Sequence, residues 1–214
     1  MEKEIIVLAK SSKQGEYCIA GIDTSTGEWI RPISNNAAKE GSVPIGDITY
    51  ENGTQVEILD KVRIRFSSHA PSRSQPENYI YDSSYYWSKE GRYTFSQVLN
   101  IRGYDKPEMI FYNAYRRVPE VEIGGEPSLL LVNIQEPTVV INTDGFRRKI
   151  SLNFVYNNTR YYDFSISDSY IKGQYNNHRD GCYPIGRDLT IVFSLTDVFM
   201  GYYYKMAAQI FLNH

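Results

Sequence analysis

The chain has 214 residues, of which 42% are hydrophobic and 14% aromatic, enough for one large β domain or two small ones. The formal net charge of −2 argues against a protein held on duplex DNA by bulk positive charge, but it leaves a local basic groove open. Cys18 and Cys182 form no CxxC pair, and no apolar run approaches the ~20 residues that span a bilayer. We therefore expect a cytoplasmic protein with reduced thiols and no membrane contact.

The first third of the chain predicts β-strands. A short apolar run covers residues 4–10, and residues 16–23 alternate between two faces. A polar turn then leads into a strand over residues 29–33, Trp-Ile-Arg-Pro-Ile. Because Pro32 lacks an amide donor, we expect this strand to end there or to lie at a sheet edge, with Arg31 accessible to solvent.

The middle of the chain is more irregular. A strand lies within residues 56–66, and residues 67–78 form a long loop of the kind that is often functional or mobile. A short helix is expected over 94–101, and an irregular or helical piece over 107–117. The stretch 119–127 contains two prolines and paired glycines, so we place the boundary there, between a domain over 1–120 and a domain over 125–214.

The second half returns to strands, over residues 128–135 and 138–142, before a hairpin whose turn is Asn157-Asn158. Asparagine tolerates the positive φ that such a turn needs. In the second arm, alternation turns Tyr162, Phe164 and Ile166 inward and leaves Tyr161 and Asp163 outward. We expect residues 170–186 to form a polar loop and residues 189–195 and 202–211 to form the last two strands.

Two segments of the chain echo each other. Residues 21–34 and 156–167 are each a hairpin with a polar turn, an aromatic residue after the turn and an Ile-Ser ending. This echo and the many short strands fit two similar small β-barrels in tandem. No segment sustains the 3.6-residue period of a long helix.

Several short motifs occur in order along nearly the whole chain. They are Cys-Ile-Ala-Gly-Ile (18–22), Gly-Glu-Trp-Ile-Arg-Pro-Ile-Ser (27–34), Gln-Pro-Glu-Asn-Tyr (75–79), Tyr-Asp-Phe-Ser-Ile-Ser-Asp (162–168) and the final strand with Lys205. In these the sequence resembles the dual OB-fold (DuOB) domain family. The resemblance implies an all-β fold of two tandem OB-like barrels with long loops and one or two short helices. It also implies a role in bacterial or phage conflict systems, with nucleic-acid binding as the proposed activity.

Trp29 and Arg31 are the first candidate site. They share one strand face, where an aromatic ring beside a guanidinium can stack on nucleobases. The alternative is a surface tryptophan over a barrel mouth with Arg31 in an ordinary ion pair. In the long loop, the amides of Gln75 and Asn78 can read base edges, or they can hold the loop in place.

The only dense basic cluster is Phe-Arg-Arg-Lys at 146–149. Arg147 and Lys149 point to the same side of a strand and can contact phosphates, although a solvated strand entrance is the alternative. Arg116, Arg117 and Lys205 can extend the same patch. The predicted ligand-binding residues are Trp29, Arg31, His69, Gln75, Glu77, Asn78, Arg147, Lys149, Tyr161, Asp163 and Lys205.

An enzymatic interpretation is weaker. Asp163, Ser165 and Asp168 invite a Ser–His–Asp set, but none of the three histidines has a partner motif, and Asp168 before Ser169 is typical of a loop cap. Metal-ligand spacing and phosphate-binding glycine loops are also missing from the sequence. We therefore expect no catalytic residue, metal or cofactor.

Two functions remain open. The leading hypothesis is a non-enzymatic module that binds single-stranded DNA or RNA, or a nucleotide. The alternative is a sensor for a small ligand or an adaptor for a protein partner from the same operon, favoured by the near-neutral charge and the 19 tyrosines. The salt dependence of the binding affinity distinguishes the two functions, because nucleic-acid binding weakens steeply as the salt concentration rises.

Overall fold

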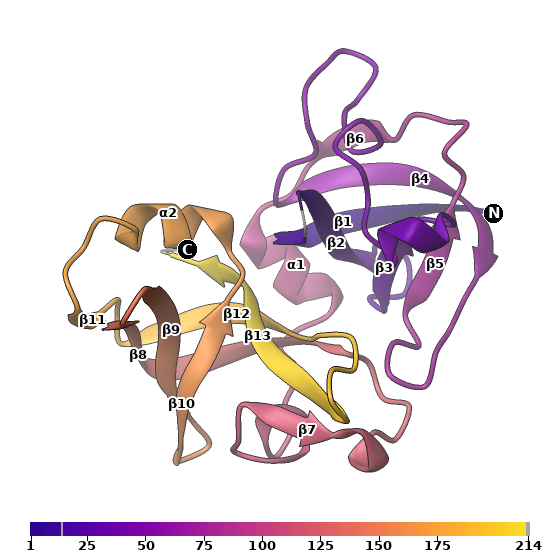
Figure 1. The fold of residues 1–214 in the computed structure, drawn as a ribbon. Helices are drawn as coiled ribbons and strands as arrows, with labels where there is room; N and C mark the ends of the chain where they lie inside the picture. The colour runs from indigo at the N-terminus through magenta and orange to yellow at the C-terminus, as the bar shows by residue number, and fades with distance from the viewer. Residues whose placement is uncertain (14, 213–214) are drawn as a thin grey trace. The chain divides into compact units, whose positions relative to one another are not determined.

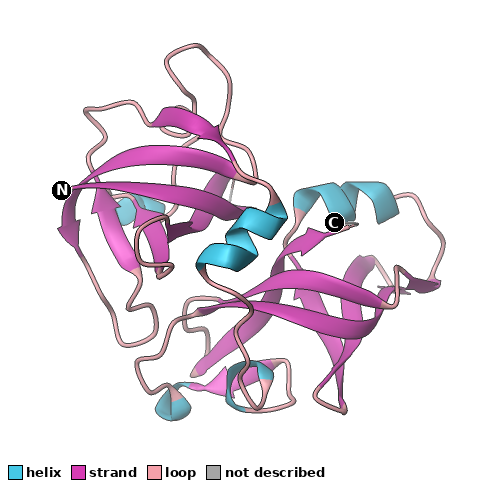
Figure 2. Ribbon diagram, turned by 180° about the vertical axis from the view of Figure 1, so that it is seen from behind, coloured by secondary structure: helices cyan, strands magenta, loops and turns pink. Residues whose placement is uncertain are grey.

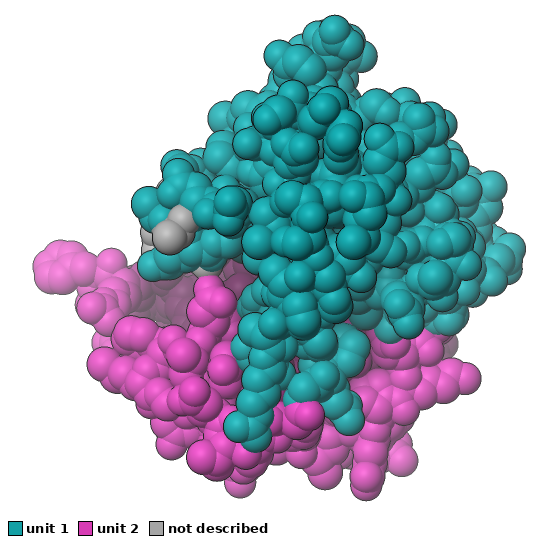
Figure 3. Space-filling model, turned by 90° about the vertical axis from the view of Figure 1, so that its right-hand side faces the viewer, with its two compact units in different colours: residues 1–103, 125–128 teal, residues 104–124, 129–214 magenta. Residues whose placement is uncertain are grey.

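The computed structural model describes residues 1–13 and 15–212, and these divide into two compact units. Unit 1 comprises residues 1–103 and 125–128, and unit 2 comprises residues 104–124 and 129–214 (Figure 3). The stretch 104–124 therefore groups with the second half of the chain, whereas the sequence-based boundary placed most of it in the first domain. Residues 125–128 return to unit 1.

Unit 1 is a closed β-barrel of five strands with one extra strand (Figure 1). Its strands are β1 (Glu2–Lys13), β2 (Glu16–Asp23), β3 (Trp29–Ile33), β4 (Asp60–His69), β5 (Asn78–Tyr81) and β6 (Ser88–Arg92). The order is β1-β2-β3-β5-β4, and β4 pairs back with β1 to close the barrel. The β3–β5 pair is parallel, and β6 joins the edge of β4.

The alternation expected within 56–66 is confirmed in β4. Val62, Ile64 and Phe66 are buried, whereas Arg63 and Arg65 point to solvent. The inward side chains join those of β1, β2 and β3 and the ring of Trp87 in one apolar core. Burial of these aliphatic and aromatic groups is the main force that closes the barrel.

Unit 2 repeats the same barrel topology. Its strands are β7 (Arg117–Pro119), β8 (Leu129–Asp144), β9 (Arg147–Tyr156), β10 (Thr159–Ile166), β11 (Gly181–Pro184), β12 (Asp188–Leu195) and β13 (Tyr202–Phe211). The barrel strands run in the order β8-β9-β10-β13-β12, with β12 paired back to β8. Here too the third and fifth barrel strands, β10 and β13, pair in parallel.

Both α-helices are short (Figure 2), and a side chain caps the start of each. α1 (Phe95–Ile101) begins after Thr94, which forms a reciprocal capping box with Gln97, as expected for 94–101. α2 (Ser169–Tyr175) begins after Asp168, whose side chain accepts from the amides of Tyr170 and Ile171; the sequence predicted a loop cap at this position, not a helix start. The structure also contains short 3₁₀ turns at Ala37–Lys39, Ile110–Tyr112 and Glu120–Glu122.

The predicted fold class is confirmed, since 51% of the chain is strand and it forms two closed five-stranded barrels. The expected polar loop over 170–186 is wrong, because this stretch contains most of α2 and all of β11. The sequence missed α2 because only Ile171 of its seven residues is buried, which leaves no apolar periodicity to detect. Within the described residues, no helix is long and apolar enough to cross a membrane.

Candidate functional site

The Arg31 side chain lies inside unit 1. β3 pairs with β2 only at Trp29 and Ile30 and with β5 at Arg31–Ile33, so the ladder on the β2 side stops before Pro32 and the strand ends one residue after it, as expected. The expectation of an accessible Arg31 is wrong, because this residue is buried. Arg31 Nη2 lies 3.3 Å from Glu77 Oε1 and donates to Ser128 Oγ at 2.7 Å. Ser128 in turn donates to both Glu77 oxygens, from its hydroxyl and its amide. The three side chains form a buried polar network rather than a ligand surface.

Trp29 is also buried, with 4% of its surface exposed. The guanidinium of Arg102, which follows α1, lies over its ring at 5.1 Å and donates to Gly27 O. The structure therefore leaves no open ring face on Trp29 for a base to stack on. Both sequence-based interpretations of Trp29, an exposed stacking platform and a surface ring over a barrel mouth, are therefore wrong.

The amide residues of the long loop are turned inward as well. Gln75, Glu77 and Asn78 are buried, and Asn78 Nδ2 donates to Gln75 Oε1 at 3.0 Å. His69 remains exposed: its Nε2 donates to Pro76 O at 2.8 Å, and its ring stacks on Tyr79 with centroids 4.3 Å apart. The loop thus holds itself in place, which was the alternative left open for Gln75 and Asn78.

In unit 2, a β-bulge reverses the predicted alternation of β10. The register shifts between Tyr161 and Phe164, and Asp163 has a φ of 65°. Tyr161 therefore points inward and stacks on Phe154, while Tyr162 is exposed, so both assignments for this pair are wrong. Lys205 is likewise interior, with 1% of its surface exposed.

Three of the predicted residues do reach the surface of unit 2, on the outer face of β9 and β10. Lys149 and Asp163 form an ion pair, and Arg116 Nη1 donates to the same Asp163 oxygen at 2.9 Å. Arg147, two residues before Lys149 on the same strand face, is exposed and has no ion pair within the described residues. We call Arg116, Arg147 and Lys149 the cationic strip.

Two aromatic side chains adjoin the chain neighbours of the strip: Phe146 precedes Arg147, and Tyr202 contacts Arg117, which follows Arg116. Phe146 occupies the β8–β9 turn and is fully exposed. On β7, the guanidinium of Arg117 lies 4.0 Å from the ring centroid of Tyr202 on β13, a cation–π contact. The sequence analysis named Phe146 only as the first residue of the basic cluster at 146–149, and nothing in the sequence paired Arg117 with Tyr202, whose contact depends on the β7–β13 pairing.

One comparison with known proteins bears on this architecture. The family model of the dual OB-containing domain matches residues 3–210, nearly the whole chain. The chain belongs to the dual OB-containing domain family. No curated protein matches it. Among solved structures, it is similar to the crystal structure of the p204 HINb domain, with 13% identity, 99% coverage of this chain, 97% of that chain and a TM-score of 0.38.

OB folds in general bind oligonucleotides and oligosaccharides on the face of their second and third strands, between the loops that join strands 1–2 and 4–5. In the second barrel of this dual OB-containing domain, these strands are β9 and β10. The first of the two loops carries Phe146, and the second, residues 196–201, carries exposed Val198, Phe199 and Met200. The cationic strip therefore lies on the face that OB folds use for ligands.

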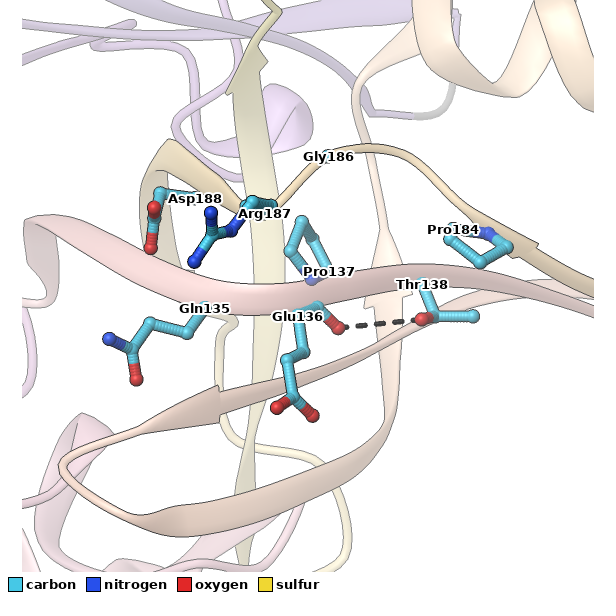
Figure 4. Close-up of a pocket in the computed structure, with 8 residues that line it drawn as sticks. All are labelled: Gln135, Glu136, Pro137, Thr138, Pro184, Gly186, Arg187 and Asp188. Carbon is cyan, nitrogen blue, oxygen red and sulfur yellow. Dashed lines mark hydrogen bonds between the residues drawn. The ribbon is translucent and has the colours of Figure 1, made fainter.

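A separate hollow of about 490 Å³ lies where β8 bends, against the segment that joins β11 to β12 (Figure 4). Its charged side chains are Glu136, Arg187 and Asp188, and Arg160 pairs with Glu136 at 3.0 Å. It contains none of the predicted site residues. Within the described residues, no group of three or more His, Cys, Asp or Glu side chains is placed to hold a metal ion.

Proposed function

We propose that this dual OB-containing domain binds single-stranded nucleic acid through the outer face of β9 and β10 in its second barrel. The observation that carries the proposal is the sharing of one carboxylate, Asp163, by Lys149 and Arg116. Among the described residues, one of the two positive charges is left without a counterion of its own. A phosphate is a suitable partner for it.

The local charge balance favours an anionic ligand. The three cations of the strip meet two carboxylates: Arg116 and Lys149 share Asp163, and Arg147 lies opposite Asp144 in the β8–β9 register. A positive patch of this kind raises the local concentration of an anion even on a chain of net charge −2. Phe146 adds an exposed ring on which an unpaired base can stack, worth roughly 1–3 kcal/mol per base.

The test is the salt dependence of binding to labelled single-stranded DNA and RNA, followed by fluorescence anisotropy. The variant Arg116→Gln, Arg147→Gln, Lys149→Gln is expected to weaken binding and to reduce the slope of log K against log salt. The expected reduction is about 0.7 per lost phosphate contact, about 2 for the three cations.

A matched control changes Lys61, Arg63 and Arg65 to glutamine. These residues lie on β4 of unit 1, and Lys61 and Arg63 pair with Glu4, so the same charge is removed from a different surface. We expect the control to keep most of the affinity and slope. An unchanged slope in the strip variant would remove this face from consideration. Absence of wild-type binding at low salt would overturn the proposal and favour the protein-adaptor hypothesis.

A further inference from the structure

The segment that supplies Arg116 is irregular and strained. The 3₁₀ turn over residues 110–112 is interrupted by a kink, where Phe111 and Tyr112 have φ angles of 47° and 67°. Non-glycine residues adopt this left-handed region only when their surroundings hold them there. The structure must therefore provide groups that fix this segment.

Lys205 on β13 provides them. Its Nζ donates to Ile110 O at 2.6 Å, to Asn113 O at 2.6 Å and to Asn113 Oδ1 at 3.0 Å. An ammonium group has three donors and no acceptor, so these three oxygens satisfy it completely. The backbone amide of Lys205 also donates to Arg116 O at 2.9 Å.

A second interior residue supports the same turn. The hydroxyl of Tyr161 on β10 accepts from the amide of Ile110 at 3.2 Å, and Asn113 Oδ1 also accepts from the amide of Tyr115 at 2.9 Å. Two of the residues predicted to touch a ligand, Tyr161 and Lys205, thus bind the segment 110–116 from inside the barrel.

We propose that Lys205 is a positioning residue that clamps residues 110–116 in one conformation and thereby places Arg116 beside Asp163 on the cationic strip. Opening the segment would remove three acceptors from an ammonium group that is otherwise surrounded by protein, including the Phe164 ring at 5.9 Å. The clamp therefore favours the closed conformation. Its effect on binding rests on the proposed function, whereas its effect on the segment does not.

The clamp carries a pH dependence. Burial lowers the pKa of Lys205 from 10.5 to about 7, although the negative charge of Glu122 acts to raise it. The other titratable groups of the cluster are Tyr161 and the Arg116–Asp163 pair. The open or unfolded chain binds this proton up to about pH 10.5, whereas the closed form releases it near pH 7. The closed form therefore gains stability between these values, and the unfolding constant falls by up to about tenfold per pH unit. Below pH 7 this contribution is constant.

The first arm of the experiment measures amide hydrogen exchange in Lys205→Met, with Lys172→Met on the exposed face of α2 as the control. We expect exchange at Ile110, Asn113 and Tyr115 to accelerate by at least about tenfold in Lys205→Met and to stay unchanged in the control. The milder variant Asn113→Ala, which removes one of the three acceptors, is expected to give an intermediate acceleration. Protection equal to the wild type in Lys205→Met would overturn the clamp.

The second arm asks whether Lys205 acts through Arg116. We expect Lys205→Met and Lys205→Met/Arg116→Gln to bind single-stranded nucleic acid equally, because the first change already misplaces the arginine. Additive losses would overturn the positioning role. The third arm follows unfolding from pH 7 to 9: the wild type is expected to gain stability relative to Lys205→Met, and parallel profiles would overturn the pH dependence assigned to Lys205. If the wild type binds no nucleic acid, the exchange arm still decides the clamp.

Discussion

Replacing Arg31 with methionine is expected to lower the free energy of unfolding of unit 1 by about 3–5 kcal/mol. The substitution leaves the Glu77 carboxylate buried with Ser128 as a hydrogen-bonding partner but without its opposite charge. Both tryptophans, Trp29 and Trp87, are buried in unit 1, so intrinsic fluorescence during urea denaturation reports on this unit. The measurement therefore separates a loss in the first barrel from events in the second.

Arg63→Met is the matched control, because Arg63 pairs with Glu4 and Glu90 on the surface of the same unit. Exposed pairs contribute about 0–1 kcal/mol, so the control should remain close to the wild type. Arg31→Lys keeps the charge but loses the guanidinium fork, and an intermediate loss is expected. A loss below about 1 kcal/mol in Arg31→Met would show that the buried pair contributes no more than a surface pair.

This network explains why the first candidate site was misassigned. The alternation of Trp29 and Arg31 predicts which side chains share a face, but it does not say whether that face meets solvent. That depends on which side chains pack over the face: Ser128, from a distant part of the chain, bonds Arg31, and Arg102 lies over the Trp29 ring. Long-range contacts of this kind leave no local signal in the sequence.

The barrels themselves were predictable because their signals are local. Alternation located β4, the Asn157-Asn158 turn has positive φ at both residues, and Thr94 caps α1. The echo between residues 21–34 and 156–167 also has a structural counterpart. Each segment covers the end of the second barrel strand and the whole of the third: β2 and β3 in unit 1, β9 and β10 in unit 2.

In the second barrel, the alternation pattern failed to predict the burial of two residues, Tyr161 and Lys205. A strict period of two assigned Tyr161 to the outside, and a one-residue irregularity at Asp163 was enough to turn it inward. Lys205 was selected as a cation that could reach phosphates. Its burial depends on oxygens of Ile110 and Asn113, residues more than 90 positions away in the chain.

Gly21→Ala is expected to destabilise unit 1 by about 3 kcal/mol or more, the upper end of the cost of overpacking. Gly21 lies in β2 between Val7 of β1 and Ile30 of β3. A Cβ at this position would lie 2.3 Å from Ile6 O and 2.9 Å from Ile6 C. Because both are backbone atoms, no side-chain rotation relieves the clash, and β1 must move. Tryptophan fluorescence in urea again measures the loss.

Gly46→Ala is the control, since a Cβ there meets nothing within 4 Å and its φ is not in the left-handed region. Its stability should stay within about 1 kcal/mol of the wild type, on the stabilising side, because alanine restricts the unfolded chain. The comparison tests how rigid the barrel wall is where the β1–β2 register shifts, between Val7 and Ala9. If Gly21→Ala had the same free energy of unfolding as Gly46→Ala, β1 would be free to shift at this bulge. A large difference would instead mean that position 21 requires glycine because β1 and β2 approach more closely there than any side chain allows.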